Sequence, residues 1–279
     1  MSSIGSRLDV FLASAGAAAL VEVAEARGST PREQGAWMLV SSEGIFGTIG
    51  GGQLEFLAIG KARELITNNQ STGGLDIPLG PEIGQCCGGR VTLSITLANE
   101  RTKDILRRRA AAEDEARPHA YLFGGGHVGH ALAEALELLP FRVAVVETRP
   151  DALSDLPEGV SRRLVAVPEE VVREAPAGSA FVVLTHDHAL DFLIVAEALK
   201  RSDAAYVGMI GSATKRETFR RWYIKEADGA EVDAARLVCP IGGSAVDKRP
   251  AVIAALTAAE IIAALSQPAI RPRVADDSY

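Results

Sequence analysis

The chain has 279 residues, of which 47% are apolar and 23% are charged, with a formal net charge of −7 and a sequence pI of about 5.4. This length suits one large domain or two modest ones with ample core, and the acidic balance excludes general nucleic-acid binding through a basic surface. Three cysteines, two of them adjacent, cannot build a disulfide framework, so we expect a cytoplasmic location.

Residues 1–100 are expected to form a small α+β domain. The alanine-rich stretch 10–23 is too short to span a bilayer and ends among acidic residues, so it predicts a helix that leads into a strand over 20–26. Apolar alternation predicts further strands over 37–40, 45–48 and 91–97. The triglycine Gly50-Gly51-Gly52 precedes apolar residues at helical spacing and predicts a turn into an amphipathic helix that ends at Asn68-Asn69. The Gly/Pro-rich stretch that follows is expected to be loop.

Two cysteines stand side by side in the segment Gly84-Gln85-Cys86-Cys87-Gly88-Gly89. Their spacing is not that of a zinc site or of a redox pair. Thiolates suit soft metals, and flanking glycines let a bulky ligand approach the backbone, so the segment predicts a contact to a metal or to sulfur. The alternative is that Cys86 and Cys87 are small buried residues in a tight turn.

The second half of the chain predicts an α/β fold. The charged, arginine-rich stretch 101–118 predicts a helical connector, and from 119 to 279 strands alternate with helices, which is typical of a Rossmann-like doubly wound parallel sheet. The expected strands are 121–123, 142–147, 164–167, 180–185, 206–210 and a short one over 237–239. The expected helices begin near His127, Pro168, Asp187 and Ser212, with a last helix over 251–265.

The string Gly124-Gly125-Gly126-His127-Val128-Gly129 fits the G-x-G-x-x-G pattern of a dinucleotide-binding turn. It follows an apolar strand and opens a helix, and Glu147 ends the next strand, which is the context this pattern requires. Unpaired N–H groups at the helix start suit a phosphate, and Glu147 would accept a ribose hydroxyl, so NAD is a candidate cofactor. The alternative is a Rossmann scaffold that binds no dinucleotide.

Two more segments are expected at the same edge of the sheet. Thr185-His186-Asp187-His188, with Asp191, follows the fourth strand and could bind a metal or move protons; alternatively Asp187 caps a helix and the histidines are surface residues. Gly211-Ser212 opens a helix that carries Lys215-Arg216 in its first turn. This helix start suits an anion, or else forms a solvated basic face.

Motifs spread over nearly the whole chain resemble those of the XdhC/CoxI family, the xanthine dehydrogenase accessory proteins. In the first domain they are Gly28-Ser29-Thr30-Pro31-Arg32, Gly47 to Glu55 and Gly84 to Gly89. In the second domain they are Phe123 to Gly129, Thr185 to His188 with Asp191, and Gly208 to Ser212 with Lys215-Arg216. Several separate motifs in the same order are more specific than a lone glycine pattern.

The resemblance implies a chaperone that binds the molybdenum cofactor (molybdopterin), holds it while a cysteine desulfurase supplies a sulfido ligand, and inserts it into apo xanthine dehydrogenase. It implies an accessory protein without turnover of its own, and we expect a homodimer. The metal contact would be Cys87, with Cys86 second. The expected cofactor-binding residues are Gly51, Gly52, Cys86, Cys87, Gly88, Gly89, Gly124, Gly126, His127, Gly129, Glu147, His186, Asp187 and Ser212. The alternative is an NAD-dependent oxidoreductase that uses the glycine loop and Glu147.

Overall fold

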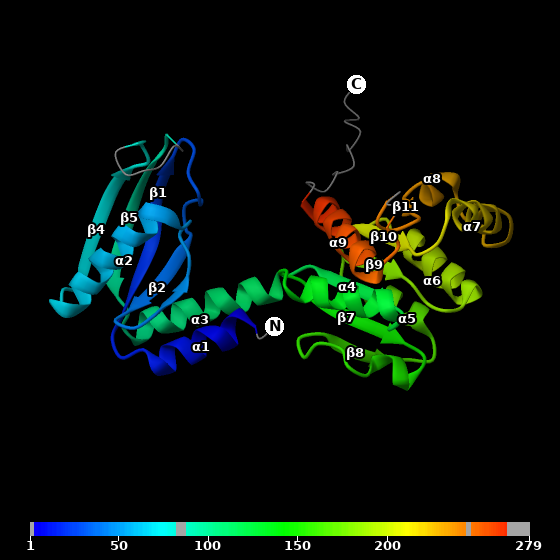
Figure 1. The fold of residues 1–279 in the computed structure, drawn as a ribbon, viewed down its shortest axis with the longest axis horizontal. Coiled ribbons are helices and arrows are strands. Elements are labelled where there is room, and N and C mark those ends of the chain that lie inside the picture. The colour runs from blue at the N-terminus through cyan, green and yellow to red at the C-terminus, as the bar shows by residue number, and fades with distance from the viewer. Residues whose placement is uncertain (1–2, 82–87, 244–246, 267–279) are drawn as a thin grey trace, which may run out of the picture. The chain divides into compact units, whose positions relative to one another are not determined.

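The computed structural model describes residues 3–81, 88–243 and 247–266. The chain forms two compact units, Ser2–Ala116 and Arg117–Tyr279. Each unit has its own sheet, its own covering helices and its own hydrophobic cores (Figure 1).

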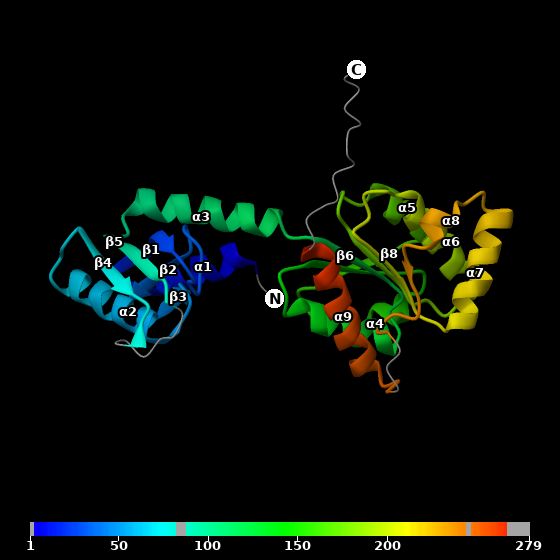
Figure 2. The ribbon, with the colours of Figure 1, turned by 90° about the horizontal axis from the view of Figure 1, so that it is seen from above.

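The first unit is built on a five-stranded antiparallel sheet in the order β3-β2-β1-β5-β4. Its elements are α1 (Ile4–Ser14), β1 (Ala18–Arg27), β2 (Trp37–Ser41), β3 (Ile45–Gly47), α2 (Gly52–Thr67), β4 (Thr72–Pro78), β5 (Arg90–Leu97) and α3 (Glu100–Glu115). Helix α2 covers one face of the sheet, and α1 and α3 cover the other (Figure 2).

The two faces follow from alternation along the strands. On β1, Val21 and Val23 face α2, whereas Leu20 faces the cluster that α1 and α3 build with β2. Helix α3 contributes the buried Leu106 and Ala110 to that second cluster. The charged stretch expected to connect the domains is therefore helical and packs into the first unit with its apolar stripe. Two of its arginines pair with carboxylates of the same unit, Arg107 with Asp9 of α1 and Arg109 with Glu22 of β1.

One expectation for the first unit is wrong. The glycine-rich stretch before the cysteine loop was expected to be loop, but it forms the edge strand β4, which pairs with β5 from Thr72↔Thr96 to Pro78↔Arg90. Gly73 and Gly74 conceal the alternation, and a Cβ atom at Gly74 would make a tight contact of 3.0 Å with the Leu93 carbonyl oxygen. Pairing with a full-length neighbour overrides the low strand propensity of glycine.

The second unit confirms the expected Rossmann-like α/β class. Its six parallel strands lie in the order β11-β10-β9-β6-β7-β8. Strands β7 and β8 are added on one side of β6, and β9, β10 and β11 on the other, so the switch point of the topology lies between β6 and β9. Its elements are β6 (His119–Phe123), α4 (His127–Glu137), β7 (Arg142–Glu147), the 3-10 helix η2 (Pro150–Leu153), β8 (Ser161–Leu164), α5 (Pro168–Glu174), β9 (Ala180–Val183), α6 (His188–Lys200), β10 (Tyr206–Met209), α7 (Ala213–Glu226), α8 (Glu231–Ala234), β11 (Leu237–Val238) and α9 (Pro250–Ser266).

Helices cover both faces of this sheet. Helices α4 and α9 pack on one face, and α5, α6 and α7 pack on the other (Figure 2). Within β6, Leu122 belongs to the first of these cores and Phe123 to the second, and both side chains are fully buried. Burial on both sides explains why the central strands are apolar at consecutive positions.

The third strand of this unit lies earlier than expected. The apolar run predicted a strand over 164–167, but β8 is Ser161–Leu164 and carries Arg162 and Arg163. An edge strand has one uncovered side, so it tolerates charged residues that hide its pattern. The starts of α4, α5, α6 and α7 agree with the expected positions. Among the described helices, none combines the length and apolar character needed to cross a bilayer.

Candidate functional site

In the first unit, the connection that follows β1 lies against the residue that precedes β5. A Cβ atom at Gly89 would come within 2.2 Å of the Ser29 carbonyl oxygen, and one at Gly28 would lie 3.3 Å from Gly89 Cα. No side chain fits at Gly89 without moving the backbone of the β1–β2 connection. Two of the motifs named above, although some sixty residues apart in sequence, therefore touch through their glycines.

The triglycine turn contacts the same connection farther along. A Cβ atom at Gly50 would lie 2.6 Å from Pro31 Cβ, so this glycine allows the two loops to meet. The φ angles of the triglycine, Gly50 to Gly52, are 123°, 75° and 64°, a run of left-handed values that other residues rarely adopt. The β1–β2 connection is thus held between Gly89 on one side and the triglycine turn on the other.

Glu55 fixes the triglycine turn from inside α2. Its Oε2 atom accepts hydrogen bonds from Thr48 Oγ1 at 2.6 Å and from the backbone N–H groups of Ile49 and Gly51 at 3.1 Å each. These bonds satisfy donors that a helix start leaves unpaired and place a negative charge at the positive end of the helix. Gly51 was expected to be a cofactor-binding residue, and its N–H group is already engaged by Glu55.

The cysteine loop joins β4 to β5, and its described ends form a narrow neck. Leu79 N–H donates to the Gly89 carbonyl and Gly88 N–H donates to the Leu79 carbonyl, both at 2.8 Å. Gly88 is exposed, with φ of 70° and no atom within 4 Å of where a Cβ atom would stand. Cys86 and Cys87, the expected metal contacts, lie outside the described residues.

In the second unit, the turn between β6 and α4 depends on glycine at three positions. Cβ atoms at Gly124, Gly125 and Gly129 would lie 2.4 Å from the Leu184 carbonyl oxygen, 1.9 Å from the Ala152 carbonyl oxygen and 2.0 Å from the Gly124 carbonyl oxygen, respectively. Gly126 differs, because a Cβ atom there would meet no other atom within 4 Å. Gly126 is the N-cap of α4, so this open space lies at the start of the helix, where backbone N–H groups lack partners within the helix. His127, the first residue of α4, is exposed there.

Glu147 is buried at the end of β7, and both of its oxygens are engaged by its own chain. Oε2 accepts from Gly125 N–H at 3.1 Å and from Arg149 Nη2 at 3.2 Å, and Oε1 accepts from Thr148 N–H at 2.9 Å. Burial opposes ionisation, but the hydrogen bonds from Arg149, Gly125 and Thr148 outweigh it and hold the pKa of Glu147 below its ordinary value. Glu147 thus fastens the glycine loop to β7, and the same lone pairs would be needed to accept a ribose hydroxyl.

The segment after β9 adopts the helix-capping alternative. Asp187 is the N-cap of α6 and accepts from Ala189 N–H at 2.8 Å, and its own N–H donates to Thr185 Oγ1 at 3.1 Å. His186 and His188 are exposed. Within the described ranges, no group of three or more histidine, cysteine, aspartate or glutamate side chains is arranged to hold a metal ion.

A buried ion pair closes this edge of the sheet. Asp191 is fully buried and accepts from Thr185 Oγ1 at 2.7 Å and from Lys215 Nζ, and Lys215 also donates to the Ile210 carbonyl at 3.0 Å. Gly211 gives Lys215 its path, since a Cβ atom there would lie 2.7 Å from Lys215 Cδ. Lys215 was expected to face a ligand or solvent; instead it ties the start of α6 to the start of α7.

The third cysteine lies beside this pair. Cys239 is buried, and its Sγ lies 3.8 Å from the carbonyl oxygen of Ser212, the N-cap of α7, whose hydroxyl already accepts from Lys215 N–H. Burial raises the pKa of the Cys239 thiol, and the positive charges of Lys215 and Arg216 only partly offset that effect. Cys239 is therefore a protonated, structural thiol at neutral pH.

Sequence reasoning missed the Asp191–Lys215 pair and the contact of Gly89 with Ser29. Both join residues far apart in the sequence, so no local spacing signals them. The only sequence signal for the pair is that each residue follows a predicted parallel strand, which places both at the carboxyl edge of the sheet.

The comparisons with known families and proteins can now be set beside this geometry. The family model described as the XdhC Rossmann domain matches residues 120–261, and the model described as the XdhC and CoxI family matches residues 11–76. The chain is 29% identical over 262 residues to the uncharacterized protein YqeB of Escherichia coli strain K12, an alignment that covers 88% of this chain and 43% of that protein. The chain therefore spans less than half the length of this curated relative.

Among solved structures, the fold is similar to that of a crystal structure described as a xanthine dehydrogenase from Bacillus halodurans. The TM-score is 0.78 at 17% sequence identity, and the match covers 97% of this chain and 98% of the other. A likeness at this identity speaks for the fold of both units and not for their chemistry.

Proposed function

The chain belongs to the XdhC and CoxI family, and on that footing we propose that it is a chaperone that binds the molybdenum cofactor, holds it during sulfuration and inserts it into apo xanthine dehydrogenase. The observation that carries the proposal is the contact of Gly89 with Gly28 and Ser29. Through it, the loop that holds the adjacent thiols is fastened to a second family motif. The partners would be the molybdenum subunit of the dehydrogenase, a cysteine desulfurase and a second copy of this chain.

Two described glycines, one in each unit, leave open space that a bulky or anionic ligand could approach. Gly88, next in sequence to Cys87, and Gly126, at the start of α4, both face open space where other glycines of their loops face backbone. N–H groups at the start of α4 would hold a phosphate, aided by the positive end of the helix dipole. The exposed His127 lies in the same first turn and adds a donor when its ring is oriented toward the anion.

The adjacent thiols would contact molybdenum or its sulfido ligand. Thiolate is a soft ligand that suits thiophilic metals, whereas the third cysteine, Cys239, is buried in the second unit and protonated. When bound, the cofactor supplies the molybdenum centre that the acceptor enzyme uses. The residues of this chain hold it, exclude reactive solvent species and release it, and we expect no turnover of their own.

The test is the cofactor content of three proteins purified side by side from molybdate-fed cells: the wild type, the double variant Cys86→Ala/Cys87→Ala, and Cys239→Ala as the matched control. Molybdenum and oxidised pterin are measured per chain. We expect both to fall together in the double variant and to stay at the wild-type level in Cys239→Ala. A double variant that retains cofactor as well as the wild type removes the thiols from the proposal.

A second candidate function is an NAD-dependent oxidoreductase, which the Rossmann topology and the open Gly126 favour. The engagement of both Glu147 oxygens by the chain itself counts against it, because a ribose hydroxyl would have to displace one of those bonds. Titration with NADH, followed by nicotinamide fluorescence, separates the two candidates. Tight binding with hydride transfer would favour the oxidoreductase, and the chaperone proposal expects neither.

A further inference from the structure

Helix α9 of the second unit has two apolar faces, of which the unit covers only one. Ala254, Ala258 and Ile261 are buried against α4 and the sheet (Figure 1). On the opposite side, every exposed residue from 251 to 265 is apolar. The stripe that begins at the second turn, the open face, consists of Ala255, Leu256, Ala259, Ile262 and Ala263. Contiguous apolar surface of this kind marks an interaction site.

The one charged residue of α9 is turned toward the sheet. Glu260 Oε2 accepts a hydrogen bond of 2.6 Å from the hydroxyl of Tyr206, a buried residue of β10. Gly208 provides the room, since a Cβ atom there would lie 2.7 Å from that hydroxyl oxygen. Glu260 stands about 100° from Ala259 around the helix axis. Its charge is therefore held to the side of the open face and not on it.

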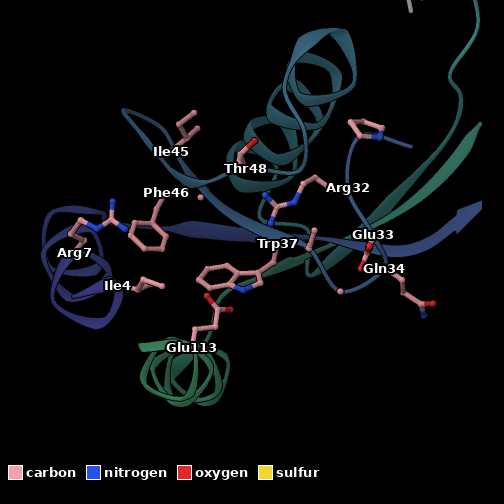
Figure 3. A pocket seen from close by; sticks show the side chains of 14 residues that line it. Ile4, Arg7, Arg32, Glu33, Gln34, Trp37, Ile45, Phe46, Thr48 and Glu113 are labelled. Carbon is pink, nitrogen blue, oxygen red and sulfur yellow. The ribbon is translucent and has the colours of Figure 1, made fainter. Parts of the chain in front are cut away.

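Other surfaces of the chain carry charge where they meet water. The exposed residues of α7, in the same unit, include Arg216, Arg221 and Lys225. In the first unit, a cavity of about 770 Å³ is lined by charges of both signs, with Glu33 next in sequence to Arg32 (Figure 3). Mixed charge of this kind is what solvent-facing surface ordinarily shows. The open face of α9 lacks it.

A hollow of about 270 Å³ lies beside the C-terminal half of α9. Ala264 of α9, Tyr206 of β10 and Val238 of β11 are among the residues that line it. Arg236 also lines it, but its guanidinium is engaged, because Nη2 donates to two backbone carbonyls at 2.9 and 3.1 Å. Ala264 and Leu256 stand about 80° apart around the helix axis. The hollow and the Leu256 side chain therefore lie on the same side of the open face.

The two ends of α9 differ in charge. Lys248 is exposed just before the first residue of the helix and forms no ion pair or hydrogen bond with any described residue. The last turn of a helix presents backbone carbonyl groups and the negative end of the helix dipole. Two such helices packed antiparallel bring each positive end to a negative end, whereas parallel packing would bring like ends together.

From the open face, the hollow and the charged ends we infer that α9 is the interface to a second copy of this chain, packed antiparallel about a twofold axis near Ala259. Side chains lean toward the N-terminus of their own helix, so Leu256 of each copy points at Ala263 of the other and at the hollow beside it. A twofold interface uses such a ridge and hollow twice.

The strength of this pairing follows from the size of the helix. The 17 residues of α9 span about 25 Å. One helix of this length supplies only part of the roughly 800 Å² per partner that a standard interface buries. We therefore expect a dissociation constant in the micromolar range, and the experiment is sedimentation velocity of the full chain over about 1–100 µM.

Single substitutions locate the interface. Ala259→Glu should weaken dimerisation at least about tenfold, because it places a carboxylate against its own copy in apolar surroundings. The matched control is Ala111→Glu, the same change at an exposed position of α3, which should dimerise like the wild type. Both positions are exposed and helical, so circular dichroism should show folded proteins that melt like the wild type.

Paired substitutions test the antiparallel arrangement. Around an axis near Ala259, position 255 of one copy lies opposite position 263 of the other. Ala255→Glu/Ala263→Glu should therefore be monomeric over the whole range. Ala255→Glu/Ala263→Lys should dimerise at least about tenfold more tightly than that variant, because opposite charges then meet across the axis. Parallel packing would repel both variants alike.

A wild type that stays monomeric over the range would overturn the inference and leave the open face to another occupant. So would Ala259→Glu that dimerises like Ala111→Glu, or a Glu/Lys pair that dimerises no more tightly than the Glu/Glu pair. A second copy is also a partner in the proposed function, but the interface rests on α9 alone. Protein that dimerises through α9 and carries no molybdenum would keep the interface and refute the chaperone; cofactor-loaded monomers would do the reverse.

Discussion

Gly126 is a position at which a substitution should weaken anion binding without changing the stability of the fold. It is the only one of the four loop glycines Gly124, Gly125, Gly126 and Gly129 whose added Cβ atom would meet open space. Gly126→Ala should therefore preserve the fold and obstruct an anion at the start of α4. Gly125→Ala, one residue earlier, is the matched control that should disturb the fold instead.

The magnitudes follow from the local geometry. Gly126 has φ of −76° and ψ of −173°, which alanine adopts freely, so the weaker capping by alanine and its smaller unfolded-state entropy nearly cancel, within about 0.5 kcal/mol. A Cβ atom at Gly125 would stand 1.9 Å from the Ala152 carbonyl oxygen. Because non-bonded atoms normally stay about 3.5 Å apart, η2 would have to move away by more than about 1 Å. Overpacking of this kind costs about 1–3 kcal/mol or more.

Two assays read these outcomes. Thermal unfolding by circular dichroism should place Gly126→Ala within about 2 °C of the wild type and Gly125→Ala lower by about 5 °C or more. Calorimetric titration with inorganic pyrophosphate should show binding at least about tenfold weaker for Gly126→Ala. Unchanged pyrophosphate affinity in Gly126→Ala would refute phosphate binding at this helix start, and an unperturbed melting temperature of Gly125→Ala would refute the packing of the turn.

Three further predictions concern buried groups of the second unit. Asp191→Asn should destabilise this unit by about 3–5 kcal/mol, because it leaves Lys215 buried without its counter-charge; a Lys215→Met/Asp191→Leu pair that is as unstable as the single variant would contradict this reason. Glu147→Gln should cost about 1.5–3 kcal/mol in urea unfolding at neutral pH. The folded-state pKa of Glu147 is lowered, so its contribution to stability is full above the ordinary carboxyl pKa of about 4.3 and is lost as the pH falls through the folded-state pKa. Plots of the free energy of unfolding against pH for the wild type and Glu147→Gln should therefore converge on acidification. Parallel plots would disprove this linkage. Cys239 should resist iodoacetamide in native protein at neutral pH and react after unfolding, as peptide mass spectrometry would show; rapid native alkylation would mean that the thiol is not buried as described.

The second unit could be predicted from sequence because its signals are local. Buried parallel strands are continuous apolar runs, and helix starts are marked by capping residues, such as Asp187 before α6 and Ser212 before α7. The edge strand β4 was not predicted, and β8 was expected over 164–167 instead of 161–164, for one physical reason. A strand with an uncovered side accepts glycine, arginine and other polar residues, and what makes it a strand is its neighbour, which lies elsewhere in the sequence.

The candidate sites divide in the same way. The glycine loop at Gly126 was visible because its residue types and spacing are themselves the signal. The hydrogen bond from Gly125 N–H to Glu147 could not be predicted from the sequence, because an acidic residue at that position predicts a contact to a ribose hydroxyl equally well. The contact of Gly89 with Ser29 has no sequence signature, because the β1–β2 connection and the start of β5 meet only in the folded unit.

The molybdenum and pterin content of the protein isolated from cells tests most directly the claim that it carries the molybdenum cofactor. Freshly isolated wild-type protein from molybdate-fed cells should contain molybdenum and pterin in equal amounts, and both should leave it together when apo xanthine dehydrogenase is added and gains activity. Protein from the same cells that carries neither molybdenum nor pterin, and that leaves the apoenzyme inactive after loading with extracted cofactor, would contradict the chaperone.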